Sequence, residues 1–228
     1  PTLRGALADL HSGGDGGLFL RALDVFGKAL LLQCRELLLL VGDLLLQVDA
    51  NTAYTRSDFD LLKRLDEFNL LLIEQPINEE DILGHAKLAN FIDTPVCLDE
   101  SIVSADIAQD AIELGAAEII NIKPARVGGY IEAKKIHDVS VANNIPVWCG
   151  GMLETGIGRA ANLALAALPG FTLPGDTSAS SRYFETDLTV PFVLKDGHIE
   201  VPNGPGIGVD PIPEIIDRFA VSREWIKR

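Results

Sequence analysis

Four side chains capable of acid–base or metal chemistry recur at nearly constant intervals in this sequence. Asp49, Glu74 and Asp99 are 25 residues apart, and Lys123 follows 24 residues later. Each lies at or near the end of a short apolar run typical of a buried strand. One acidic residue at such a place is usually a helix cap or a solvated loop group. Three at one spacing, followed by a lysine, indicate a built site.

Three carboxylates that converge repel one another unless a cation lies among them. Hard oxygen ligands favour Mg²⁺, or Mn²⁺, which keeps coordination positions open for water and substrate. A buried lysine is costly unless it has an anionic partner or a chemical role. Beside such a metal, Lys123 could act as a base or as a cationic partner. The pattern therefore predicts removal of a proton next to a metal-bound carboxylate.

The elements that must position these residues follow a regular alternation from residue 44 onward. Short apolar runs alternate with longer amphipathic segments about every 25 residues, which predicts right-handed βαβ units and a parallel sheet. We expect an α/β fold, a TIM-like (β/α) barrel, because a doubly wound sheet usually carries a G-x-G-x-x-G loop and none occurs here. Strands are expected at 44–49, 70–76, 95–100, 118–124, 145–151 and 171–176, with a possible weaker one at 18–23. Helices are expected near 57–68, 79–91, 104–115, 129–143 and 156–167.

Composition excludes several classes of function. The chain has 228 residues, of which 47% are hydrophobic, and a net charge of −14, which argues against nucleic-acid binding. Its three cysteines form no C-x-x-C pair, so we expect neither a disulfide scaffold nor a thiolate zinc site, and a reducing cytoplasm is predicted. We expect no signal peptide and no membrane association, since no uncharged apolar span of about 18 residues occurs.

Five motifs carry a resemblance to a known family. They are "VDANTAY", "LIEQP", "CLDES", "NIKPARVGG" and "CGGMLETGIGRAANLALAALPGFTLPGDTSAS". Over about residues 44–228 the chain closely resembles the enolase superfamily, in particular the o-succinylbenzoate synthases and the related N-acylamino acid (N-succinylamino acid) racemases. The resemblance implies that Lys123 is one of two catalytic lysines and that Asn51 lies beside the metal without binding it. It also implies a set of Mg²⁺ ligands, namely Asp49, Glu74 and Asp99.

The remaining candidate residues are open to two interpretations. By the resemblance, Gly150, Gly151 and Met152 form a substrate-contacting loop, although the glycines could simply permit a tight turn and Met152 could pack within the loop. Glu100 follows a predicted ligand and is expected to shape its surroundings. We expect a surface position for His85, His137 and His198, and a core position for Cys97, Trp148 and Cys149.

The family chemistry starts with proton abstraction next to a carboxylate. It leads either to dehydration, which gives o-succinylbenzoate for menaquinone biosynthesis, or to racemisation of an N-acyl or N-succinylamino acid. For dehydration the resemblance gives Lys123 a cation–π role, with the opposite lysine as base, and for racemisation both lysines exchange protons. The substrate would be a small succinylated or N-acylated carboxylate. The sequence does not choose between these reactions, and it leaves the oligomeric state, including a homo-oligomer, open.

Two departures from the family occur near the start of the chain. The second lysine belongs to a K-x-K motif, but "LRAL" places Arg21 and Leu23 there. Residues 1–43 form an atypical segment, and we expect an N-terminally incomplete barrel over 44–228 without the family's capping domain. A reading frame whose first 43 residues are translated out of frame is a hypothesis that would explain both departures. A metal-binding barrel remnant without turnover is therefore the alternative to an enzyme.

Overall fold

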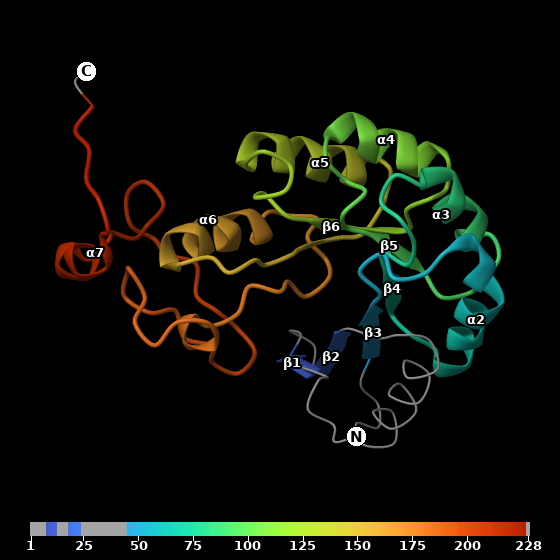
Figure 1. Cartoon of the computed structure of the whole chain (residues 1–228), viewed down its shortest axis with the longest axis horizontal. Helices are drawn as coiled ribbons and strands as arrows, with labels where there is room; N and C mark the ends of the chain where they lie inside the picture. The colour runs from blue at the N-terminus through green and yellow to red at the C-terminus, as the bar shows by residue number, and fades with distance from the viewer. Residues whose placement is uncertain (1–7, 13–17, 24–44, 227–228) are drawn as a thin grey trace.

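A computed structural model describes residues 8–12, 18–23 and 45–226 of the chain. Within these residues one sheet holds its strands in chain order (Figure 1). The first pair is antiparallel and every later pair is parallel. The strands are β1 (Ala8–Ser12), β2 (Leu18–Leu23), β3 (Leu45–Asp49), β4 (Leu72–Glu74), β5 (Val96–Leu98), β6 (Ile119–Ile122) and β7 (Val147–Cys149).

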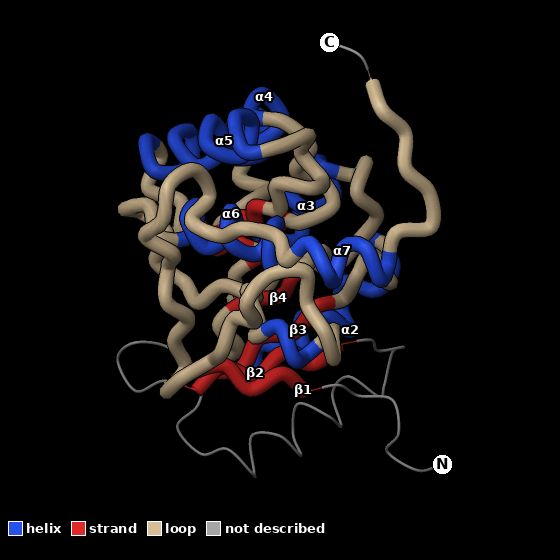
Figure 2. Tube along the Cα trace, turned by 90° about the vertical axis from the view of Figure 1, so that its left-hand side faces the viewer, coloured by secondary structure: helices blue, strands red, loops and turns tan. Residues whose placement is uncertain are grey.

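Helices follow the strands in regular alternation. Figure 1 shows α2 to α5 along the outer side of the curved sheet, and Figure 2 shows α4 and α5 at the opposite end of the molecule from β1 and β2. This arrangement confirms the α/β barrel-type fold, including the weaker strand predicted at 18–23. The helices are α2 (Phe59–Lys63), α3 (Ile82–Ala89), α4 (Ala105–Glu113), α5 (Tyr130–Ala142), α6 (Gly156–Ala166) and α7 (Pro213–Phe219).

The expected strand at 171–176 is only partly formed. Phe171 makes an isolated parallel bridge to Val147, and Asp176 donates its backbone N–H to the Cys149 carbonyl at 2.9 Å. Between them Leu173 donates to the Val147 carbonyl at 3.4 Å, but the next donor to β7 is Asp176, three residues on, so the two-residue period of a parallel ladder is broken and no regular strand forms. The segment nevertheless runs beside β7, where the prediction placed it.

Successive residues of each strand point to opposite faces of the sheet. On the outer face Ile73, Leu98 and Ile120 join the main hydrophobic core beneath the helices. On the inner face a smaller buried cluster contains Leu72, Cys97, Ile119 and Trp148. By the same alternation, Glu74, Asp99 and Asn121 lie on the inner face, two residues beyond members of that cluster. On the inner face, each strand therefore carries an apolar residue first and a polar residue at its carboxyl end.

The prediction that the histidines lie at the surface is wrong for two of three. His85 and His137 are buried, whereas His198 is exposed. The His137 ring stacks on Phe171 with centroids 5.1 Å apart, and its Nε2 lies 2.8 Å from the Pro169 carbonyl oxygen. Packing partners distant in the sequence decide these positions. Trp148, Cys97 and Cys149 are buried, as expected.

Beyond α7 the described residues 220–226 form an extended segment. Figures 1 and 2 show it leaving the body of the molecule. Trp225 is 94% exposed there, in contrast to Trp148 on β7, which is 1% exposed. In the described part of the chain, no helix has the length and apolar character needed to cross a membrane. The chain's leucine-rich stretch at 29–46 lies largely outside the described residues.

Candidate active site

The predicted site residues lie at the carboxyl ends of four adjacent strands. Asp49 and Glu74 are the last residues of β3 and β4, and the strand register pairs them directly. Asp99 and Lys123 each follow the last residue of their strands, β5 and β6. The three acidic residues are almost fully buried, with exposed fractions of 2%, 0% and 2% in chain order. Ionised groups this deeply buried require compensating partners.

Asp99 is compensated by two cations. Lys123 Nζ lies 2.5 Å from Asp99 Oδ2, and the Arg126 guanidinium pairs with Oδ1. Arg126 also donates to the Ile102 carbonyl at 2.8 Å and to the Asn121 carbonyl at 2.7 Å. Burial lowers the pKa of Arg126 to about 10, while the nearby Glu74 charge opposes that shift. Arg126 therefore stays protonated at neutral pH and ties the loops after β5 and β6 together.

Asn121 connects a second carboxylate to the lysine-bearing strand. Its Nδ2 donates to Glu74 Oε1 at 2.7 Å, and the side chain is fully buried. Among the described residues its Oδ1 has no hydrogen-bond partner. That oxygen lies where a side chain at Gly150 would begin, since an added Cβ would come within 2.2 Å of Asn121 Oδ1 and 2.7 Å of Lys123 Cε. Gly150 therefore leaves the space that Asn121 and Lys123 occupy.

The other predicted contacts take different positions around the site. Asn51 has an exposed side chain, but its backbone N–H donates to Asp49 Oδ1 at 3.0 Å. Gly151 is required by close packing, because an added Cβ would meet the Asp176 carbonyl oxygen at 2.0 Å. Met152 is half exposed, and Glu100 is partly buried. Substrate contact by Gly150, Gly151 and Met152 stays a prediction.

The strand that the resemblance assigns to the second lysine lies beside Asp49. Strand β2 pairs in parallel with β3, with Leu23 opposite Asp49 and Arg21 opposite Gln47. The assignment of Arg21 and Leu23 to the K-x-K positions stays a prediction. In this sequence neither position carries a lysine. Lys28 falls outside the described residues.

Sequence reasoning missed two polar residues that organise the site. Arg126 contacts Asp99, and Gln75, directly after Glu74, is fully buried and accepts the backbone N–H of Asp99 at 3.0 Å. Both belong to motifs quoted above, "NIKPARVGG" and "LIEQP". Each is a polar residue close in sequence to a predicted ligand or to Lys123, which could have indicated a role. The spacing of the motifs did not show that their side chains point into the site.

The donor set fits a hard divalent cation by the chemical type of its ligands. Asp49, Glu74 and Asp99 are buried carboxylates on one face of adjacent strand ends, and oxygen donors of this kind suit Mg²⁺. Their side chains are not gathered around one point, since the part of the chain described here contains no group of three His, Cys, Asp or Glu that could hold a metal. Asp99 instead faces Lys123 and Arg126, so metal binding would require it to exchange at least one of these cations.

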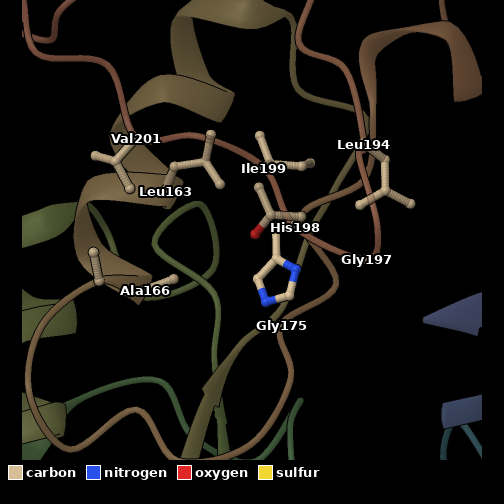
Figure 3. Close-up of a pocket in the computed structure, with 10 residues that line it drawn as sticks. Leu163, Ala166, Gly175, Leu194, Gly197, His198, Ile199 and Val201 are labelled. Atoms are coloured by element: carbon tan, nitrogen blue, oxygen red, sulfur yellow. The ribbon is translucent and has the colours of Figure 1, made fainter. Parts of the chain in front are cut away.

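A separate apolar cavity lies elsewhere on the molecule. It has a volume of about 300 Å³ and lies between α6 and the 194–201 segment (Figure 3). Leu163 and Ala166 on the helix lie on one side of it and Leu194 on the other, with the His198 ring between them above Gly175. None of the four strand-end residues lines this cavity. It is therefore distinct from the candidate active site.

Comparison with known proteins assigns the fold and the motifs to one family. The model of the enolase C-terminal domain-like family matches residues 30–215. An N-succinylamino acid racemase from Amycolatopsis is 67% identical over 81% of this chain and 50% of its own length. An o-succinylbenzoate synthase from Geobacillus stearothermophilus is 53% identical over 83% of this chain and 49% of its own length. A solved enolase-superfamily member from Listeria innocua has a TM-score of 0.81 at 37% identity and covers 96% of this chain and 64% of that one.

These matches place the chain in the enolase superfamily, in the enolase C-terminal domain-like family. Its curated relatives are enzymes named o-succinylbenzoate synthase and N-succinylamino acid racemase. The chain spans about half the length of these relatives. The predicted family is thereby confirmed.

Proposed function

We propose that this chain provides the barrel part of a Mg²⁺-dependent enzyme that removes a proton next to a carboxylate, of the o-succinylbenzoate synthase type. The observation that carries the proposal is the succession of Asp49, Glu74, Asp99 and Lys123 at the carboxyl ends of adjacent strands. In barrel enzymes that face holds the active site. The names of the relatives supply the substrate class, a small carboxylate bearing a succinyl group.

Each residue has a defined role in this proposal. Asp49, Glu74 and Asp99 would hold Mg²⁺ (or Mn²⁺), which when bound supplies positive charge against the negative charge that develops on the substrate carboxylate. In racemisation Lys123 Nζ would accept or return the substrate's α-proton, and in dehydration it would stabilise the enolate as a cation. Its Nζ lies 2.5 Å from Asp99 Oδ2, at the edge of the proposed metal site. Asn121 fixes the Glu74 carboxylate, and Gly150 leaves room for the Lys123 side chain.

Two reactions share this first step. Dehydration would yield o-succinylbenzoate, for menaquinone biosynthesis, in the cytoplasm that the cysteine content predicts. Racemisation of an N-succinylamino acid is the second candidate, because the Amycolatopsis relative with 67% identity is a racemase. The two are distinguished by product: formation of o-succinylbenzoate in the first case, and loss of optical activity in the second.

The direct test follows the substrate's α-proton. The purified chain would be incubated in D₂O with Mg²⁺ and each enantiomer of an N-succinylamino acid, and the α-proton signal followed by NMR. We expect exchange of one enantiomer, because Lys123 approaches from one side only. Lys123→Ala should slow it by about 10²–10⁴-fold, the usual contribution of a general base. Lys134→Ala is the matched control, since Lys134 is exposed and pairs with Asp138 on α5.

The alternative, a metal-binding barrel without turnover, is favoured by the sequence of β2. Arg21 and Leu23 stand where the family carries K-x-K, so this chain lacks the second lysine at that place. Mg²⁺ binding without exchange of either enantiomer would establish this alternative and overturn the proposed turnover. Failure to bind Mg²⁺ or Mn²⁺ at all would overturn both.

A further inference from the structure

Gln75 is a buried polar residue at the centre of the loops that carry the proposed metal ligands. Its side chain has no exposed surface, and it follows Glu74 directly. Its backbone has a φ of +37°, a left-handed conformation that a residue other than glycine rarely adopts. Such strain persists only where the surroundings fix it, and it is concentrated at functional sites. The side-chain contacts of Gln75 show what fixes it.

The Gln75 amide oxygen holds the turn that carries Asp99. Oε1 accepts the backbone N–H of Asp99 at 3.0 Å and that of Ser101 at 3.2 Å. Because both donors are backbone N–H groups, the amide cannot be flipped without losing both bonds. Gln75 therefore positions the main chain on which the Asp99 carboxylate depends.

The Gln75 amide nitrogen is held in place by a second group of acceptors. Nε2 donates to Ser101 Oγ at 2.8 Å and lies 3.3 Å from His85 Nε2. Ser101 in turn donates to the Glu79 carbonyl at 2.8 Å, which leaves its oxygen free to accept from Gln75. His85 Nδ1 faces the Asp81 carbonyl at 2.9 Å, so a neutral ring protonated at Nδ1 can accept from the amide. Helix α3 is thereby linked to the amide.

The Gln75 backbone joins the neighbouring strand ends. Its N–H donates to the Cys97 carbonyl at 2.8 Å, and its carbonyl accepts the Thr52 N–H at 2.8 Å. Thr52 lies in the turn after Asp49, where Asn51 and Thr52 also have positive φ values of 43° and 62°. One residue thus contacts the turns that follow β3 and β5 while belonging to the turn that follows β4.

We propose that Gln75 is a positioning residue that sets the geometry of Asp49, Glu74 and Asp99 for binding a divalent cation through its side-chain amide and strained backbone. This inference rests on the proposed function, since it assumes that these carboxylates are the ligands. Residues that orient metal ligands typically change affinity by about 10–100-fold when replaced. Gln75 acts through Asp99 and needs no contact with the metal or substrate.

The test separates positioning from general stability. Gln75→Leu keeps the approximate size but removes the acceptor, and we expect a Mn²⁺ dissociation constant at least about 10-fold higher. Gln75→Glu retains an oxygen for the Asp99 and Ser101 N–H groups and should restore their slow hydrogen exchange. Thr94→Val is the matched control: Thr94 is buried just before β5, the strand that leads to Asp99, and donates to Asp66 Oδ1 at 2.8 Å. This variant should lower thermal stability and leave the Mn²⁺ affinity within about two-fold of the wild-type value, because Thr94 contacts none of the proposed metal ligands.

Amide hydrogen exchange of the metal-free protein tests the inference independently of the metal. Faster exchange at Asp99 and Ser101 in Gln75→Leu, but not in Thr94→Val, is the expected result. Unchanged exchange or unchanged Mn²⁺ affinity in a folded Gln75→Leu protein would overturn the inference. If Gln75→Leu does not fold, Ser101→Ala replaces it, because it removes one acceptor of the amide, and unchanged exchange at Asp99 would then contradict the proposal. Absence of Mn²⁺ binding by the wild-type chain would instead contradict the proposed function.

Discussion

The two ends of the sheet use polar side chains in different ways. At the amino ends, carboxylates accept backbone N–H groups: Asp66 accepts from Thr94 at 2.9 Å, and Glu118 accepts from Val96 at 2.9 Å. At the carboxyl ends, charged side chains meet other charged side chains, as in the pairing of Asp99 with Lys123 and Arg126. The first arrangement completes the hydrogen bonding of the backbone, whereas the second exceeds what the backbone needs.

If the proposed function holds, this difference separates stability from function along the same strands. Asp66 takes up donors that would otherwise be unpaired at the start of β5, which a fold requires. Buried ion pairs contribute little net stability, because desolvation offsets their attraction. Their concentration on the inner face at the carboxyl ends therefore points to a chemical role. A substitution at the amino ends of the strands should therefore leave Mn²⁺ affinity unchanged, whereas one at the carboxyl ends should lower it.

The largest effect is expected at a proposed ligand. Glu74→Gln keeps shape and removes the buried charge, so Mn²⁺ affinity should fall by about 100-fold or more, beyond the loss typical of an outer partner. Glu118→Gln, at the amino end of β6, should leave the affinity unchanged. Isothermal titration with Mn²⁺ measures both. If Glu74→Gln bound Mn²⁺ as tightly as the wild-type chain, the two ends of the sheet would not differ in metal binding, and the prediction would be wrong.

A smaller effect is expected at the turn after β7. Gly150→Ala would drive a methyl group into Asn121 and Lys123 and should cost about 1–3 kcal/mol, as overpacking does, together with a loss of Mn²⁺ affinity through the Asn121–Glu74 bond. Gly115→Ala meets no atom within 4 Å but has a φ of +66°. It should cost about 1–2 kcal/mol of backbone strain. Urea denaturation and Mn²⁺ titration would distinguish them, and equal Mn²⁺ affinities would contradict the prediction.

The smallest effect concerns the buried histidine of α3. Burial lowers the pKa of His85 from its ordinary value of 6.5, although the Asp81 carbonyl and carboxylate oppose this. Below pH 6.5 the unfolded chain binds a proton at His85 that the folded chain does not, so the free energy of unfolding should fall as the pH decreases from there.

Thermal unfolding between pH 8 and pH 5 tests this expectation. His85→Gln should flatten the profile in the window just below 6.5, and the exposed His198→Gln serves as the control. The lowered pKa values of Asp66 and Asp81 produce their own loss of stability with acid, but nearer their ordinary value of 3.8. A histidine variant that retains the full wild-type slope just below 6.5 would contradict the assignment to His85.

The sequence predicted the strand ends because periodicity is a local property. The 25-residue rhythm located Asp49, Glu74 and Asp99 at β3, β4 and the turn after β5, and even the weak β2 strand formed as expected. It could not predict the pairing of Asp99 with Arg126, because that pairing depends on how the chain turns after β6. Sequence position alone also cannot show whether a glycine such as Gly150 serves a turn or a close approach.

The polar network around Gln75 was the hardest part to predict. Glutamine is usually exposed, so a buried one between a ligand and a proline gives little signal in a single sequence. His85 was misjudged for a related reason, since its burial depends on Gln75 and on the fold of α3 against the sheet. Local propensity identified the elements, and long-range packing decided which polar residues turned inward.

The contrast between the two tryptophans gives the protein two optical reporters. Trp148 is buried on β7, its indole N–H directed at Cys97 Sγ at 3.4 Å, and the register places it beside Asn121. Trp225, almost fully exposed in the terminal segment, meets solvent quenchers freely. With only two tryptophans in the chain, acrylamide should silence one emission and spare the other. The protected emission would then report changes next to Asn121 without any added label.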